Sequence, residues 1–321
     1  MKNVKNDFIY KLKGIAIISV VCAHCGNRVS YTFLDNIINE IRGNIATIGV
    51  PLFFIISGYL FHNDKPYVEF WKRKWSSTIV PWIFWGTLVW AYEVIRKGLS
   101  YAKLLEWLFG IGTYLWYMRT LVIFWALLYF VKTHKIKVYV FIISLMVRII
   151  LYDVLKASIS NIIIEDFLLN LPLFALGTLL SEVQLSNVKQ LINKHIFCIP
   201  FLILIPLIVN NHRMSYSPPL FLIYICGCLL VALILIEKTE KCKYLADGLV
   251  TLGKHSYLIY LIHMPIAGLM SNLFSRNSIL LYFALIQPII VLIISEYAVK
   301  FIEIFGKKYR IVAFTIGIKK V

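Results

Sequence analysis

The chain has no polar stretch long enough to fold as a soluble domain, since none reaches even thirty of its 321 residues. A soluble catalytic module is therefore excluded. Soluble domains are about 45–50% apolar, whereas this sequence is 60% hydrophobic, with a mean hydropathy of +0.78. We predict a polytopic membrane protein in which residues 1–321 form a single membrane-embedded domain.

Acidic residues are scarce, with 16 Asp and Glu against 33 Lys and Arg and a net charge of +17. The basic residues gather between apolar segments, as expected of charges that orient membrane spans, so we expect no nucleic-acid partner. Carboxylates suited to ion coupling are also scarce, because Glu93, Glu296 and Glu303 all fall near the ends of apolar segments. This scarcity counts against an ion-coupled transporter.

Several functional motifs are missing. The sequence has no ATP-binding P-loop, dinucleotide fingerprint or serine nucleophile elbow. Six cysteines give no disulfide framework, and although Cys22, His24 and Cys25 resemble a metal site, helical spacing directs the histidine away from both thiols. We therefore expect no metal. The first apolar run also lacks a small-residue cleavage site, so we expect no cleavable signal peptide.

What the chain has in abundance is apolar segments of membrane-spanning length. They cover approximately residues 9–29, 45–61, 78–95, 112–131, 137–155, 166–181, 195–210, 218–236, 254–274 and 278–301. With the N-terminus inside, 23 Lys and Arg fall on the cytoplasmic side and 8 outside, while Arg119 and Arg148 lie within spans. This asymmetry predicts an all-α bundle of about ten transmembrane helices with both termini inside. We expect Arg148 to snorkel outward.

The first apolar segment places a titratable imidazole at membrane depth, which usually marks a functional site. Lys13 and His24 are eleven residues apart, so on a helix they share one face and stand about 16 Å apart along the axis. A cation near the membrane edge and a neutral base half a bilayer away suggest a long ligand lying along this helix. Alternatively, His24 bonds to a neighbouring helix and Lys13 only fixes orientation.

Two other segments carry candidate binding residues. Lys72, Arg73 and Lys74 precede the third span, where they either obey the positive-inside rule or hold a phosphorylated ligand. Arg119 lies inside the fourth span near its external end. The aromatic residues before it are explained as anchors at the membrane interface, whereas an arginine inside the span is less easily explained in this way.

The ninth segment carries a polar stripe on an otherwise apolar helix. Ser256, Tyr260 and His263 follow one another at i, i+4 and i+7 and therefore share a face. Pro265 is expected to bend the helix just beyond the histidine.

Six short pieces of the sequence, in this order, resemble the acyltransferase-3 family, membrane acyltransferases that modify cell-surface polysaccharides and related envelope molecules in bacteria. The pieces are Lys13-Gly-Ile-Ala-Ile with His24, Gly49-Val-Pro-Leu-Phe-Phe-Ile-Ile-Ser-Gly-Tyr-Leu60, the basic loop ending in Pro81, Leu115-Trp-Tyr-Met118, Leu173-Phe-Ala-Leu-Gly177 and Ser256-Tyr-Leu-Ile-Tyr-Leu-Ile-His263. Each piece is mostly apolar, and their order along nearly the whole chain makes the resemblance specific. Lys13 stands where the family often has arginine, and Ser76, Ser77 and Thr78 stand where a second cation is expected.

The resemblance implies an O-acyltransferase of the bacterial cell (inner) membrane that moves an acyl group, most often acetyl from acetyl-CoA, to a hydroxyl of a glycan or lipid-linked sugar. His24 falls on the family's histidine and would act as general base or carry the acyl group transiently. The remaining candidates would bind substrate: Lys13, Arg73 and Lys74 the donor phosphates, and Arg119, Tyr260 and His263 the acceptor or the oxyanion. The alternatives are a transporter or flippase for a glycan or lipid-linked intermediate and, more remotely, a non-catalytic subunit of an export complex.

Overall fold

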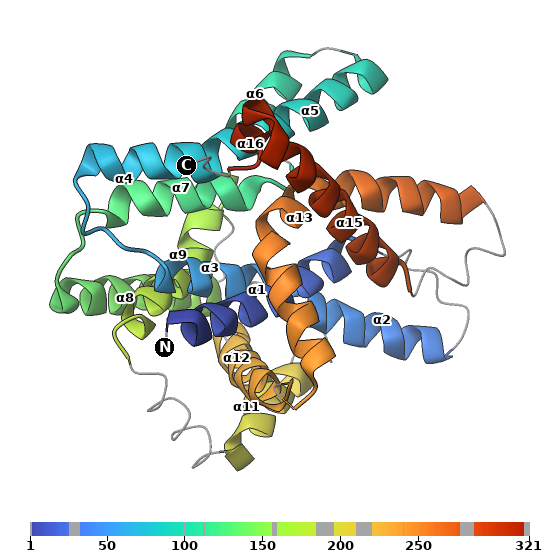
Figure 1. Cartoon of the computed structure of the whole chain (residues 1–321). Coiled ribbons are helices and arrows are strands. Elements are labelled where there is room, and N and C mark those ends of the chain that lie inside the picture. Colours follow the sequence, from blue (N-terminus) through green and yellow to red (C-terminus); the bar gives the residue numbers. More distant parts are fainter. Residues whose placement is uncertain are drawn as a thin grey trace. The chain divides into compact units, whose positions relative to one another are not determined.

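The computed structural model describes residues 2–25, 33–98, 100–111, 113–155, 159–183, 196–209, 220–239, 241–276 and 286–317. Within these ranges the chain is almost entirely helical and contains no strand, as predicted. The elements, shown in Figure 1, are α1 (Lys2–His24), α2 (Phe33–Ala46), α3 (Gly49–Tyr59), α4 (Tyr67–Lys74), η1 (Trp75–Ile79), α5 (Val80–Lys97), α6 (Tyr101–Phe109), α7 (Trp116–Leu128), α8 (His134–Arg148), η2 (Ile149–Val154), α9 (Ile162–Leu180), η3 (Ile196–Cys198), α11 (Ile199–Val209), α12 (Leu220–Thr239), α13 (Lys243–Arg276), α15 (Gln287–Lys308) and α16 (Arg310–Thr315).

Each of the ten predicted apolar segments contains a helix. Four stretches of the described chain are long and apolar enough to cross a membrane, namely Asn39–Tyr59, Tyr67–Ile95, Ile162–Leu180 and Leu220–Thr239. Two further apolar helices, Trp116–Leu128 and Ile196–Val209, are shorter. The fold is thus a helical membrane bundle, while ten spans and the inside location of both termini remain predictions.

The second apolar segment differs from the prediction of one span beginning near residue 45. Helix α2 already starts at Phe33, a turn at residues 47–48 follows, and α3 begins at Gly49. Hydropathy does not reveal α2, because its apolar positions Ile37, Ile41 and Ile45 recur every fourth residue among polar ones.

The chain forms two compact units, each built from two separate segments. Unit 1 comprises Met1–Phe61 with Thr133–Ser256, and unit 2 comprises His62–Lys132 with Tyr257–Val321. In unit 1, α3 packs against both α1 and α9, α8 packs against α9, and α11 packs against α12. Its core joins α1, α3 and α12 through buried residues: Ile9, Leu12, Ala16, Leu52, Ile56, Ala232 and Ile236.

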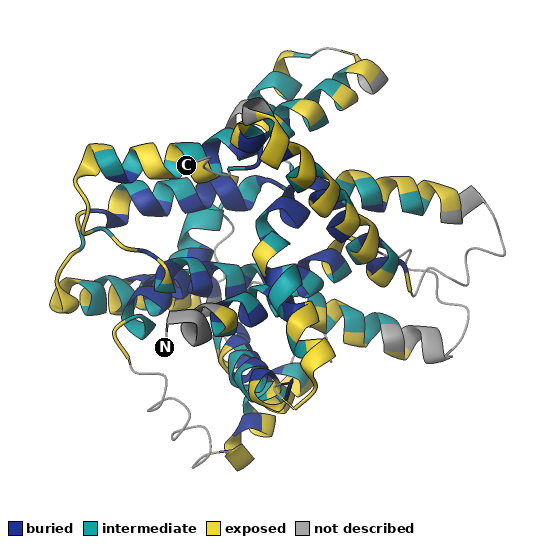
Figure 2. Cartoon of the chain, in the orientation of Figure 1, coloured by how far each residue is buried: buried dark blue, intermediate teal, exposed yellow. Residues whose placement is uncertain are grey.

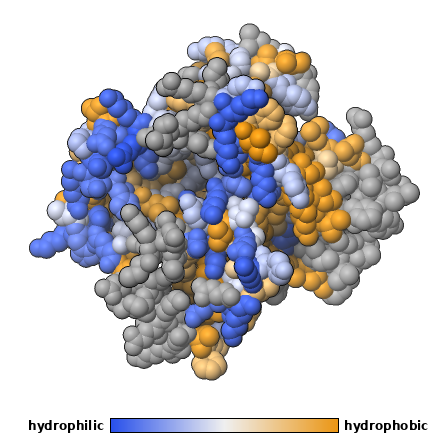
Figure 3. All heavy atoms as spheres, in the orientation of Figure 1, coloured by the Kyte–Doolittle hydropathy of each residue, from blue (hydrophilic) through white to orange (hydrophobic). Residues whose placement is uncertain are grey.

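In unit 2, α16 packs against both α15 and α5, and α5 also contacts α6. The α15 helix exposes a stripe of large apolar side chains, because Ile289, Ile293, Tyr297 and Phe301 are each more than half exposed (Figure 2). They recur every fourth residue and therefore share one face. Many other large hydrophobic side chains of the described residues are exposed, and hydrophobic patches appear between hydrophilic residues on the face shown in Figure 3. An apolar exterior of this extent suits contact with lipid rather than water.

Candidate active site

Helix α1 carries both candidate residues of the first segment. His24 is its last residue and its side chain is exposed, whereas Ile17 and Val20, on the same face, are buried. Lys13 is half-buried, and its Nζ lies 5.9 Å from the centroid of the Tyr10 ring. The structure therefore keeps a cation and an imidazole on one continuous helix, about 16 Å apart along its axis.

Glycines in the recognised pieces set how closely the neighbouring helices approach α1. A Cβ added at Gly49 of α3 would lie 2.8 Å from the Ala16 carbonyl oxygen and 2.7 Å from the Val20 side chain. A Cβ at Gly58 would overlap the Phe174 carbonyl oxygen of α9. Only glycine therefore allows α3 to pack this tightly between α1 and α9, and this packing fixes the helix that presents His24.

Helix α13 also meets α1 through glycines. A Cβ at Gly253 would overlap the carbonyl oxygen of Tyr10, and one at Gly14 would overlap that of Leu249. The contact places Lys254 beside Tyr10, with its Nζ 5.7 Å from the ring centroid. Lys254 is not among the residues predicted from the sequence, because it lies just before the recognised piece that begins at Ser256 and nothing in its local sequence indicates the contact with Tyr10.

The basic run before the third span lies on α4 in unit 2, and two of its members contact other side chains. Arg73 forms an ion pair with Glu69 at 2.7 Å, and its side chain is half exposed. Lys74 is half-buried, with its Nζ 4.2 Å from the centroid of the Trp125 ring of α7 and 5.5 Å from that of Phe70. Arg73 is thus the more accessible of the two.

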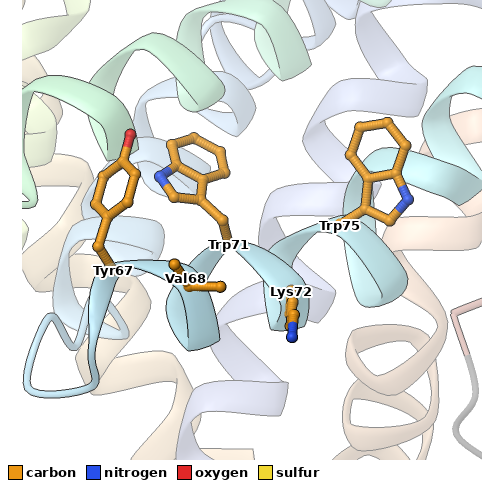
Figure 4. A pocket seen from close by; sticks show the side chains of 5 residues that line it. All are labelled: Tyr67, Val68, Trp71, Lys72 and Trp75. Atoms are coloured by element: carbon orange, nitrogen blue, oxygen red, sulfur yellow. The ribbon is translucent and has the colours of Figure 1, made fainter.

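The helix continues from α4 through the π-helical turn η1, where the Ser77 hydroxyl donates to the Arg73 carbonyl oxygen at 2.8 Å. Beside it lies an open groove of about 510 Å³, lined by Tyr67, Val68, Trp71, Lys72 and Trp75. In Figure 4 the three aromatic side chains project from one side of the helix and Lys72 from the other. Tyrosine, tryptophan and lysine in this arrangement are typical of a helix at a membrane interface.

Tyr260 and His263 belong to a buried aromatic cluster in unit 2. The Tyr260 hydroxyl donates to the Tyr114 carbonyl oxygen at 2.5 Å, and the Tyr114 hydroxyl donates to the Leu261 carbonyl oxygen at 2.6 Å. The rings of Tyr114 and Tyr260 lie 5.5 Å and 6.0 Å from that of His263, and the Tyr117 ring lies 5.7 Å from that of Tyr260. The structure therefore brings these two candidates together and locks α13 to the residues just before α7.

His263 is completely buried, and its Nδ1 lies 2.8 Å from the Tyr260 carbonyl oxygen. A carbonyl oxygen only accepts hydrogen bonds, so Nδ1 carries the proton. In the neutral ring the lone pair is then on Nε2. This arrangement fixes the ring's orientation and defines which nitrogen can accept a hydrogen bond.

Arg119 is buried in α7, and its Nη1 donates to the Gly110 carbonyl oxygen at 3.3 Å. Gly110 ends α6 in the left-handed conformation, with φ of 60°. A cation near the last carbonyls of a helix is favourable. The contact gives Arg119 a structural role in joining α6 to α7.

The prediction that Arg148 snorkels outward is wrong. Its side chain is only 2% exposed, donates to the Leu169 carbonyl oxygen of α9 and lies 5.3 Å from the centroid of the Phe221 ring of α12. A buried backbone acceptor and an aromatic face offset the desolvation of the charge. Arg148 therefore ties α8 to two other helices of unit 1.

Within the described ranges, no three His, Cys, Asp or Glu side chains group as metal ligands would. The apolar helices, four of them long enough to cross a bilayer, define the class as a helical membrane protein. A family model described as "Acyltransferase domain" matches residues 6–295, nearly the whole chain, so the protein belongs to the acyltransferase-3 family. Comparisons with curated proteins and with solved structures gave no match.

Proposed function

We propose that this acyltransferase moves an acyl group, with acetyl-CoA as the expected donor, to a hydroxyl of a cell-surface or lipid-linked glycan in the bacterial inner membrane. The observation that carries this proposal is the family match over residues 6–295. The position of His24 at the end of α1, on the same face as Lys13, supports it, because transfer to a hydroxyl needs a base within reach of an extended donor.

In the proposed reaction, His24 accepts the proton of the sugar hydroxyl while the hydroxyl oxygen forms a bond to the thioester carbonyl carbon. The tetrahedral intermediate then collapses, the carbon–sulfur bond breaks, and the CoA thiolate takes the proton from the imidazolium. Loss of a positioned general base usually costs about 10²–10⁴-fold in rate. An acyl group carried briefly on His24 would divide the same transfer into two steps.

The other candidates have proposed binding roles. Lys13, Arg73 and Lys74 bind the donor phosphates, a role for which the half-exposed Arg73 is better placed than Lys74 packed on Trp125. Arg119, Tyr260 and His263 bind the acceptor or stabilise the oxyanion, with the lone pair on Nε2 of His263 as the acceptor of a hydrogen bond.

The test compares His24→Gln with wild type by mass spectrometry of surface glycans from cells that express equal amounts of each protein. Glutamine keeps hydrogen bonding and bulk but cannot take up the proton, so we expect glycan acylation to fall at least 100-fold. His62→Gln, at an exposed histidine in the loop after α3, is the control and should acylate normally.

Two outcomes would contradict the proposal. Wild-type acylation in cells that contain only the His24→Gln protein would rule out His24 as the catalytic base. Glycans that are identical with and without the wild-type protein would rule out acyl transfer to a glycan, and would favour passage of the glycan through the bundle.

A further inference from the structure

The contact between α1 and α13 assembles two cations that are far apart in sequence. Because a Cβ at Gly253 would overlap the Tyr10 carbonyl oxygen, the next residue, Lys254, is held against α1. Lys13 lies one turn along α1 from Tyr10, so its side chain reaches the same ring. The Nζ atoms of Lys13 and Lys254 lie 5.9 Å and 5.7 Å from the Tyr10 ring centroid.

The two ammonium groups therefore lie within 12 Å of each other, since each is within 6 Å of one centroid. Within the described residues neither ammonium group forms an ion pair with a carboxylate, and each lies near the Tyr10 ring. An aromatic face contributes only about 0.5–2 kcal/mol to holding a cation. Two like charges within 12 Å of each other, one of them on a half-buried side chain, create a positive potential that an anion would complement.

We propose that Lys13 and Lys254, both within 6 Å of the Tyr10 ring centroid, bind the phosphate groups of the CoA donor. The inference rests on the proposed acyl transfer and adds Lys254 as a binding residue for its donor. Lysine ammonium groups are compact charges on flexible stems and suit phosphates without requiring a fixed fork geometry.

The location of the pair agrees with a donor that extends along α1. From Lys13 to His24 the axis advances about 16 Å, and both residues belong to the same face. Phosphates at the lysines would leave the thioester arm directed along the helix towards the imidazole. The two lysines, Tyr10 and His24 all belong to unit 1.

Equilibrium binding of CoA tests the pair without turnover and without a known acceptor. The full chain is placed in nanodiscs of phosphatidylcholine, and Kd is measured for CoA and for pantetheine, which lacks the phosphates. We expect Lys254→Ala to raise the Kd for CoA about tenfold and to leave that for pantetheine unchanged. Lys254→Arg should restore most of the affinity, because it keeps the charge.

Lys243→Ala is the matched control, since Lys243 is also an exposed lysine of α13 but lies three turns before Lys254. It should bind CoA as wild type does. Equal thermal unfolding of the variants shows that a change in Kd does not come from loss of the fold.

An anionic lipid headgroup presents the same phosphate chemistry, so the measurement is repeated in discs that contain phosphatidylglycerol. If Lys254→Ala changes stability only in the anionic discs and never changes CoA affinity, the lysines bind lipid and the proposal is overturned. Unchanged CoA affinity in both kinds of disc, or an equal loss for pantetheine, also overturns it. Failure of acyl transfer itself would appear separately, as unmodified glycans in cells.

Discussion

Glu182, just after α9, accepts hydrogen bonds from Lys137 Nζ at 2.6 Å and from His134 Nδ1 at 2.5 Å, both on α8. The Lys137 bond, followed by the His134 bond, holds the pKa of the Glu182 carboxyl below its ordinary value. A carboxyl with a lowered folded-state pKa adds stability above its unfolded pKa and loses it as the pH falls through the folded pKa. Glu182→Gln should therefore lower the unfolding temperature at neutral pH and match wild type in acid.

The size of this effect is set by the exposure of the groups, because exposed ion pairs contribute about 0.2–1 kcal/mol. Thermal unfolding in detergent, followed from neutral to acidic pH, measures it. Glu106→Gln, at an exposed glutamate of α6, should leave the pH profile unchanged. A Glu182→Gln protein with the same pH dependence as wild type would show that the two bonds do not couple protonation to stability.

Single residues also show what the sequence alone can and cannot specify. His24 stands out as an imidazole in an apolar run, so the sequence alone singles it out. The surroundings of Arg148 and Lys254 depend on Phe221 and Tyr10, which are 73 and 244 residues away along the chain. Nothing in a local hydropathy pattern specifies such pairings. The sequence thus singles out candidate residues, but their contacts become visible only in the structure.

At the scale of helices, α3 and α9 of unit 1 approach each other closely through Gly58 and Gly177. A Cβ at Gly177 would overlap the Ile55 carbonyl oxygen and lie 2.8 Å from the Tyr59 backbone nitrogen. Backbone atoms cannot move aside as a flexible side chain can, so Gly177→Ala should force the two helices apart. We expect a loss of about 1–3 kcal/mol of stability, measured as a lower unfolding temperature in detergent.

Gly248→Ala in α13 is the control, because nothing lies within 4 Å of a Cβ placed there. Alanine is the better helix former, so this variant should be as stable as wild type or slightly more so. If Gly177→Ala unfolds at the same temperature as Gly248→Ala, the close approach of α3 and α9 does not limit stability.

Helices were predicted well where they are apolar throughout and poorly where polar residues interrupt them. The ten apolar segments all contain a helix, because burial in lipid requires every backbone group to bond within its own segment. Helices α2, α4 and α6 were missed, since they lie in stretches interpreted as loops between the spans. The π-helical turns η1 and η2 were also missed, because such turns depend on how the flanking helices pack and have no pattern of their own in the sequence.

For the whole molecule, the strongest prediction is its orientation. The division of 23 basic residues to one side and 8 to the other predicts that the connections after α3 and after α7 lie in the cytoplasm. Reporter fusions after Asn63 and after Lys135 should read cytoplasmic, and a fusion after Arg213, which lies outside the described ranges, should read external. A cytoplasmic signal at Arg213 would mean that one span has been miscounted.

The alternation of the two units along the chain has a consequence for biosynthesis. Residues 62–132 of unit 2 lie between the two segments of unit 1. The ribosome therefore synthesises them before it reaches the second segment of unit 1. At about 5–20 residues per second, those 71 residues take roughly 4–14 s to synthesise. During that interval the glycine face of α3 stays bare in the nascent chain, because α9 does not yet exist. The insertion machinery must therefore shield a half-built bundle until its covering helix emerges.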